Sequence, residues 1–280
     1  GIVYAIDGVC IVAIFGYFSK VSGDLAGLNG VIIYYSIVAI VLGILLFFLM
    51  KDSKPDTTVK IEEKQEKITA AQVIEVVKMP AVWILSAILC CTYVMNIAFY
   101  YFTPYATSRF GMAATAGAIV TLAAQYVRPV ASFGGGILAD KLGRSKVMYV
   151  TFSMMAIGTF LMVVMGNMSF TLFIVLCILI YAGMYGGFSM VFSMMEEGGI
   201  PIRVAGTAIG LVCTLGYLPE VIVPFASGKL LDTFGDDGYR YIFIAIVVIM
   251  IIGIVMLTVW DRYTKKLRAK KAVEEVCTEA

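Results

Sequence analysis

The chain has 280 residues, of which 61% are hydrophobic and only 14% are charged, and its net charge is +2. Soluble domains carry about 25% charged residues, so this composition predicts an integral membrane protein. The small net charge gives no electrostatic support for a nucleic-acid partner. The chain contains no histidine, which excludes catalysis, metal binding and pH switching by that side chain. Its six cysteines show no CxxC spacing, so the pattern predicts neither a zinc site nor a disulfide framework.

Eight apolar runs are each long enough to cross a bilayer, whose hydrocarbon core of ~30 Å needs about 20 helical residues. They cover approximately residues 1–18, 31–50, 81–102, 112–134, 147–166, 169–192, 204–228 and 240–260. The first run has no starting methionine, no basic flank and no cleavage site, so it is interpreted as a span of a truncated chain rather than as a signal peptide. The expected fold is therefore an all-α membrane bundle with about eight transmembrane helices.

The distribution of lysine and arginine predicts the orientation of these spans. If segment 51–80 is cytoplasmic, sixteen of the 21 basic residues lie on the cytoplasmic side, which is a strong positive-inside signal. Four lie on the opposite side, and they are Lys20, Arg109, Lys229 and Arg240. We therefore expect a protein of the cytoplasmic (inner) membrane, with segment 51–80 and the C-terminus in the cytoplasm.

Segment 51–80 is the one clear linker in the chain. It mixes charges of both signs with a single proline, Pro55, which is typical of a solvated segment. Its end, from Thr69 to Val77, has the pattern of a capped amphipathic helix on the membrane surface. The predicted organisation is two helices in 1–50, the linker 51–80, six helices in 81–260 and a basic tail in 261–280.

A dense motif between the fourth and fifth runs, GGGILADKLGRSK at 134–146, resembles the signature loop of the major facilitator superfamily of transporters. That loop joins the second and third helices of each six-helix half. The segment EEGGIPIRVAGTAIG at 196–210 resembles the turn before the family's eleventh helix, and KMPAVW at 78–83 resembles the entry to its seventh. The resemblance implies that the chain holds helices 5–12 of the usual twelve. Residues 1–50 would then end the N-terminal half, and 81–260 would form the complete C-terminal half.

In that family the signature loop latches the cytoplasmic side in the outward-facing state. The matching positions here are Gly136, Asp140, Gly143 and Arg144. Glycines allow helices to approach closely and a turn to adopt positive φ. An aspartate is favoured near a helix N-terminus, and the following basic residues are suited to pair with it. The alternative is that these residues are only topogenic charges on a tight turn.

Charges within spans are costly and are functional candidates. Arg128 in the fourth span and Asp7 in the first lie at similar depth, and the family's fifth and eighth helices face each other, so an ion pair is predicted. The alternatives are that Arg128 snorkels to the interface and that Asp7 is interfacial. Glu220 lies between two helix-interrupting prolines, which suits proton or cation coupling. It is equally suited to bind freed backbone groups or a neighbouring hydroxyl.

Neutral candidates come from the third and sixth spans. Asn96 lies four residues before Tyr100, and Tyr181 lies four before Tyr185, so each pair shares a helix face. The resemblance implies that these spans are the seventh and tenth helices, which line the substrate cavity in the family. Glycines beside the second pair would permit a gate to flex. Ordinary packing of aromatic and small residues is the alternative.

These features predict a secondary active transporter that moves a small solute across the cytoplasmic membrane by alternating access. Arg128 favours an organic or inorganic anion as substrate. The alternatives are a proton-coupled carrier of a neutral sugar or drug-like solute, by symport or antiport, and a transport-dead sensor. We expect no enzyme activity, cofactor or metal. The expected partners are the solute, the bilayer and protons or a counter-ion, and we expect the complete protein to be a monomer.

Overall fold

The computed structural model describes all residues except 1, 50–69, 112–113, 167 and 280. Within these residues the chain is helical and contains no strand, which confirms the predicted all-α class. The elements are α1 (Ile2–Ser22), α2 (Asp24–Leu49), α3 (Ala70–Val77), α4 (Pro80–Phe110), α5 (Ala114–Leu142), α6 (Arg144–Val164), α7 (Phe170–Val191), η1 (Ser193–Gly198), α8 (Ile202–Gly216), α9 (Pro219–Phe234), η2 (Gly235–Asp237) and α10 (Gly238–Glu279).

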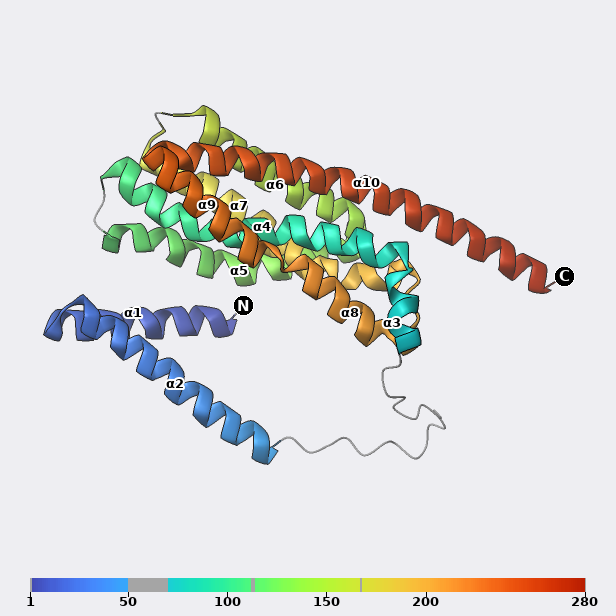
Figure 1. Cartoon of the computed structure of the whole chain (residues 1–280), viewed down its shortest axis with the longest axis horizontal. Helices are drawn as coiled ribbons and strands as arrows, with labels where there is room; N and C mark the ends of the chain where they lie inside the picture. The colour runs from blue at the N-terminus through green and yellow to red at the C-terminus, as the bar shows by residue number, and fades with distance from the viewer. Residues whose placement is uncertain (1, 50–69, 112–113, 167, 280) are drawn as a thin grey trace. The chain divides into compact units, whose positions relative to one another are not determined.

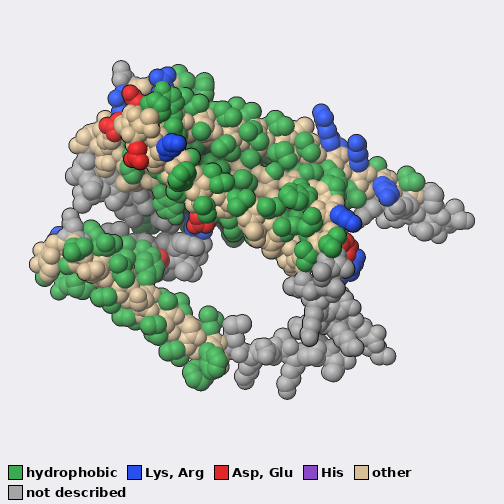
Figure 2. Space-filling view, viewed as in Figure 1, with side chains coloured by type: hydrophobic (Ala, Val, Ile, Leu, Met, Phe, Trp, Pro, Cys, Tyr) green, Lys and Arg blue, Asp and Glu red, His purple; other side chains and the backbone are tan. Residues whose placement is uncertain are grey.

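Five segments of the described chain are long and apolar enough to cross a membrane. They are Leu25–Leu49, Pro80–Phe110, Arg144–Val164, Phe170–Phe188 and Ile202–Lys270, the last of which contains α8, α9 and most of α10. Helix α5, which contains the fourth predicted span, is 29 residues long. It is not among the five apolar segments, and it carries the charged candidate Arg128. Hydrophobic side chains dominate the surface between the two ends of the α4–α10 bundle, as Figure 2 shows.

The chain divides into two compact units, residues 2–67 and residues 68–280. In the first unit, α1 and α2 pack against each other after a turn at Gly23, where φ is +86°. Gly27 and Gly30 at the start of α2 lie directly against the rings of Phe15 and Phe18. A larger side chain at either glycine would separate the two helices. Most of the predicted linker 51–80 lies outside the described residues, apart from α3 and the residues that follow it.

In the second unit, α4 contacts α5, α7, α8, α9 and α10, and so forms the centre of a helical bundle (Figure 1). Its core is rich in aromatic rings. Tyr105 lies 5.6 Å from Phe173 and 5.1 Å from Phe243, measured between ring centroids. Phe102 and Tyr181 are fully buried beside them. Helix α3 packs on α4 and α8, with Val76 buried and Ile74 exposed. Its predicted position on the membrane surface stays a prediction.

The predicted glycine-rich turn at 134–146 is wrong in its extent. Helix α5 continues to Leu142 and α6 begins at Arg144, so the turn is essentially Gly143, where φ is +94°. The earlier glycines lie inside α5, and one of them, Gly135, allows close packing. A Cβ atom built on Gly135 would lie 3.2 Å from the Cα atom of Gly186 on α7. Gly135 thus faces a partner helix, whereas a Cβ atom on Gly134 or Gly136 would meet nothing within 4 Å.

Other helix ends also differ from the expected ones. Helix α4 runs beyond residue 102 to Phe110 and ends at Gly111, whose φ of +59° is that of a left-handed helix cap. Helix α10 runs beyond residue 260 to Glu279 and projects past the other helices of its unit (Figure 1). No glycine or proline follows Gly253, and the lysine, arginine, alanine and glutamate of the tail favour a helix. The seventh predicted span is divided into α8 and α9, because Pro219 begins a new helix.

The glycines of α7 set the distance to α6. A Cβ atom on Gly183 would lie 2.7 Å from the carbonyl oxygen of Thr151, which is backbone and cannot rotate away. Gly187 is equally close to the Thr151 side chain. These contacts favour the interpretation that the glycine row of the sixth span serves close packing.

We expect Gly183→Ala to lower the free energy of unfolding by about 1–3 kcal/mol, since the added methyl group must push α6 and α7 apart. Gly210→Ala is the matched control, because a Cβ atom there meets nothing within 4 Å. The control should be neutral or slightly stabilising, since alanine is the better helix former. Thermal unfolding of both variants in detergent measures the difference. Equal stability of the two variants would show that close packing of α6 and α7 at Gly183 does not contribute to the stability of the protein.

Candidate functional site

Glu220 lies at the break between α8 and α9, in the first turn of α9. Its side chain is exposed, and its carboxylate accepts a hydrogen bond from the hydroxyl of Tyr93 at 3.3 Å. The ring of Tyr93 in turn packs against Tyr217, with centroids 4.5 Å apart. A carboxylate in this position is stabilised by the positive end of the helix dipole. The break therefore presents an acidic group, held by a tyrosine of α4, within an apolar span.

Pro219 explains why the helix breaks at this point. Proline has no N–H group and fits the first position of a helix, so α9 begins there. The backbone groups around the break are satisfied locally. The Tyr217 N–H donates to the Cys213 carbonyl at 2.9 Å, and the Glu220 N–H donates to the Tyr217 carbonyl at 3.0 Å. The side chain of Glu220 is thus not needed to cap the freed backbone, and it faces a hydroxyl instead.

Arg128 is the second charged candidate in the bundle. It is half-buried on α5, and its guanidinium carbon lies 5.0 Å from the centroid of the Tyr185 ring on α7. This distance is within the range of a cation–π interaction. The hydroxyl of Ser132, one turn further along α5, donates to the Tyr185 carbonyl at 3.4 Å. Close packing of α5 and α7 thus brings a cation and an aromatic ring together.

The two clusters are connected through α7. Phe188 follows Tyr185 by three residues and so lies one turn away on the same helix. The Phe188 ring is 6.2 Å from that of Tyr93, the residue that binds Glu220. Helix α7 therefore contacts the basic group of α5 on one side and the tyrosine of α4 on the other.

The remaining neutral candidates are placed differently. Asn96 is half-buried, and Tyr100 is 64% exposed on α4. Tyr181 has no exposed surface and packs against the rings of Phe99 and Phe102. Tyr181 is therefore part of the aromatic packing between α4 and α7, and its predicted role at the solute site stays a prediction. The role of Asn96 and Tyr100 in binding stays a prediction.

Asp7 accepts a hydrogen bond from the hydroxyl of Tyr35 at 2.8 Å, within the α1–α2 unit. This contact gives the carboxylate a polar partner inside an apolar helix pair, which lowers the cost of its charge. Asp7 and Arg128 belong to different units. Their predicted ion pair therefore stays a prediction.

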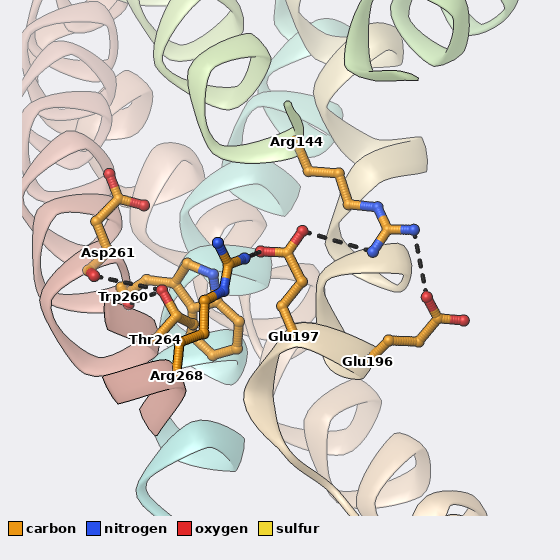
Figure 3. Close-up of polar contacts among 7 residues, drawn as sticks. All are labelled: Arg144, Glu196, Glu197, Trp260, Asp261, Thr264 and Arg268. Atoms are coloured by element: carbon orange, nitrogen blue, oxygen red, sulfur yellow. Dashed lines mark hydrogen bonds and ion pairs between the residues drawn. The ribbon is translucent and has the colours of Figure 1, made fainter. Parts of the chain in front are cut away.

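A charged network lies where α6 begins, next to η1 and the end of the buried part of α10 (Figure 3). Arg144 binds Glu196 at 3.2 Å and Glu197 at 3.5 Å. Glu197 also binds Arg268 of α10 at 3.2 Å, so its carboxylate joins two arginines. Asp140, predicted to pair with these basic residues, is exposed at the end of α5. Among the described ion pairs, Arg144 binds the two glutamates of η1 instead.

Close packing holds this network in place. The carbonyl of Gly198 accepts a hydrogen bond from Tyr263, and a Cβ atom on Gly198 would lie 2.8 Å from the ring of buried Trp260. Gly199, with a φ of +69°, then turns the chain away. The sequence contained the acidic pair at 196–197 but did not identify it as the partner of Arg144. Arg144 and Glu196 are 52 positions apart in the sequence, so only tertiary packing can bring them together.

Comparison with known proteins gives a consistent assignment. The family model described as Major Facilitator Superfamily matches residues 1–224. Two curated Escherichia coli (strain K12) proteins are similar: inner membrane protein YqcE, 26% identical over 224 residues, and inner membrane protein YihN, 22% identical over 249. These alignments cover 78% and 87% of this chain. They cover 52% and 58% of the relatives, so the chain spans little more than half their length.

Two solved structures share the fold. One is a bacterial homologue of the human lysosomal transporter Spinster, in an inward-facing, unoccupied conformation, with a TM-score of 0.59 at 13% identity. The other is a bacterial homologue of the iron transporter ferroportin, in an outward-facing state, with a TM-score of 0.54 at 14% identity. The matches cover 87% and 89% of this chain and 59% of each solved chain.

We expect Glu197→Gln to destabilise the protein more than Glu196→Gln does. Glu197 is only 20% exposed and binds two arginines, whereas Glu196 is 80% exposed and binds one. Loss of two charge-assisted bonds should cost about 1–3 kcal/mol, and an exposed pair contributes little. Thermal unfolding of the two variants side by side makes the comparison. If Glu196→Gln were the more damaging change, the assignment of Glu197 as the centre of the network would be wrong.

Proposed function

Because the chain belongs to the Major Facilitator Superfamily, we propose that it acts in a secondary active transporter that moves a small solute across the cytoplasmic membrane by alternating access. The family is a transporter family and not an enzyme class. Two inner membrane proteins among its relatives support the location, and two solved transporters support the fold. The organisation into an α1–α2 unit, a linker and the α4–α10 bundle fits the last two helices of one half followed by a complete second half.

The observation that carries the proposed substrate class is the guanidinium of Arg128 over the ring of Tyr185. An arginine in an apolar span is costly and is kept where it has a task. The ring helps to position the guanidinium, and a guanidinium is a group that binds negatively charged solutes. We therefore propose an organic or inorganic anion as the solute. Arginine is well suited to carboxylate and phosphate groups because its planar fork makes two parallel hydrogen bonds.

Glu220 is the proposed coupling residue. Discontinuous helices in transporters place their ends near the substrate site, where helix dipoles and freed groups bind ions. Here the α8–α9 break carries a carboxylate whose partner is the neutral hydroxyl of Tyr93. Such a carboxylate can take up a proton without breaking an ion pair. This arrangement also favours a second candidate function, a proton-coupled carrier of a neutral sugar or drug-like solute.

The network at η1 is proposed to act with the signature segment as the conformational latch. Gly143 gives the turn, Arg144 supplies the charge, and Glu197 ties it to α10. The bonds hold the ends of α6, η1 and α10 together, which suits a six-helix half that moves as a rigid body. Gly136 and Asp140 are included on the resemblance. The basic residues at this end support its placement in the cytoplasm.

The proposal is tested by solute uptake into proteoliposomes that contain the complete protein. Anions and sugars are screened with and without an imposed pH gradient. Uptake of an anion supports the proposal, and uptake of a neutral solute only with a pH gradient supports the second candidate. A protein that binds solutes but carries none would be a sensor on the same scaffold.

We expect Arg128→Gln to reduce anion uptake by at least about tenfold, because one lost charge-assisted contact is worth more than 1.4 kcal/mol. Arg128→Lys keeps the charge but loses the planar fork and should retain part of the activity. Tyr185→Phe is the matched control, since it retains the ring. Initial rates of uptake at equal protein incorporation give the comparison. Wild-type rates in Arg128→Gln would remove this residue from the solute site.

We expect Glu220→Gln to abolish the stimulation of uptake by a pH gradient while leaving exchange of solute across the membrane intact. Glutamine keeps the hydrogen bond to Tyr93 but cannot take up a proton. Tyr93→Phe removes that hydrogen bond and keeps the carboxylate, so its uptake should still respond to the gradient. Counterflow and gradient-driven uptake are measured on the same vesicles. A normal pH response in Glu220→Gln would contradict the coupling role.

A further inference from the structure

A cavity of about 340 Å³ lies at the end of the bundle opposite the η1 network. It is lined by the last turn of α4, the end of α6, η2 and the first turn of α10. Its volume is at the lower end of the range for small-molecule sites. It shares no lining residue with the Arg128 cluster or the Glu220 cluster. The topology predicted from the basic residues places this end on the non-cytoplasmic side, at the level of the lipid headgroups.

The floor of the cavity is apolar and aromatic. Phe243 and Met162 are 1% and 3% exposed, and Tyr239 is 8% exposed. Tyr105 packs edge-to-face on both Tyr239 and Phe243, with centroids 5.5 and 5.1 Å apart. Tyr105 lies on α4, Met162 on α6, and Tyr239 and Phe243 on α10, so three helices form this floor. The floor is therefore a fixed surface on which a ligand of the interface can rest.

The rim carries two cations and two anions. Arg109 at the end of α4 donates a hydrogen bond to the Gly166 carbonyl, which holds its guanidinium beside the end of α6. Arg240 lies across the cavity on α10, and Asp236 and Asp237 come from η2. In the part of the chain that the structure describes, no ion pair joins either aspartate to Arg240. Figure 2 shows basic and acidic side chains together at this end of the bundle, next to hydrophobic surface.

We propose that this cavity binds a zwitterion in which a phosphate is joined to a primary ammonium, as in the ethanolamine phosphate headgroup of a phospholipid. The arginines match the phosphate, and the ammonium supplies three N–H donors to the two aspartates. A ligand that is only an anion would be repelled by the two aspartates, and one that is only a cation would be repelled by the two arginines. The shared chemistry is that of phosphoethanolamine, either free or as the headgroup of a lipid whose chains lie along the apolar helices.

The test is calorimetric titration of the full chain in detergent with four soluble probes. They are dihexanoyl phosphatidylethanolamine, dihexanoyl phosphatidylglycerol, phosphoethanolamine and inorganic phosphate. We expect the ethanolamine lipid to bind more tightly than the glycerol lipid. Binding of phosphoethanolamine that approaches that of the lipid would identify a soluble ligand, and binding of the lipid alone would identify the membrane as the source. Equal affinity for both lipids, or binding of neither, would overturn the proposal.

Two variants test the charges separately. Arg240→Gln should lower the affinity for the ethanolamine lipid by about tenfold, which is the effect of losing one charge-assisted contact. The double variant Asp236→Asn with Asp237→Asn should bind the ethanolamine lipid more weakly, because the partners of the ammonium are lost. It should bind the anionic glycerol lipid more tightly, because the repulsion between the aspartates and an anion is removed. Lys229→Gln and Asp232→Asn are matched controls, since both side chains are exposed at the same end and do not line the cavity.

Unchanged selectivity in the aspartate double variant would overturn the assignment of the ammonium to these residues. Circular dichroism of each variant verifies that the helices are retained. The measurement does not depend on transport, so its failure would leave the proposed transport function intact. Failure of transport would likewise leave the binding result intact.

Discussion

The close approach of α5, α6 and α7 is the constraint on which the rest of the α4–α10 unit depends. Gly135 of α5 faces Gly186 of α7, and Gly183 faces the backbone of Thr151 on α6. Lipid offers no hydrophobic drive between helices, so association relies on van der Waals packing and on small residues that allow it. This packing brings Arg128 against Tyr185. It also fixes the end of α7, from which η1 carries its glutamates toward Arg144.

The two charged candidates in the apolar part of this unit, Glu220 and Arg128, each contact an aromatic residue of another helix. The break between α8 and α9 leaves Glu220 with a hydroxyl from another helix rather than with a counter-charge. The guanidinium carbon of Arg128 lies 5.0 Å from the centroid of the Tyr185 ring on α7. These contacts are the observations on which the proposed coupling role of Glu220 and the proposed solute-binding role of Arg128 rest.

The two ends of the bundle differ in the way they use charge. At η1 the carboxylates and guanidinium groups bind each other, and the result is a stable connection between α6 and α10. At the opposite end the charges of both signs surround a cavity above an aromatic floor. The charges at this second end line a space, and this arrangement is the basis of the proposed binding of a zwitterion. The same residue types thus form ion pairs at one end and line a cavity at the other.

The sequence by itself determined the all-α membrane class, the positions of the apolar runs and the family, because hydrophobic length and the dense motif at 134–146 are local properties of the chain. It also identified Arg128 and Glu220, since charges in apolar runs are visible without a structure. Only the tertiary structure decided the partners of these charges, the helix contact made by Gly135 of the motif, and the burial of Tyr181. Glu197 with Arg268, Tyr93 with Glu220 and the cavity at η2 each join segments far apart in sequence. Such pairs are created by packing, and no spacing along the chain encodes them.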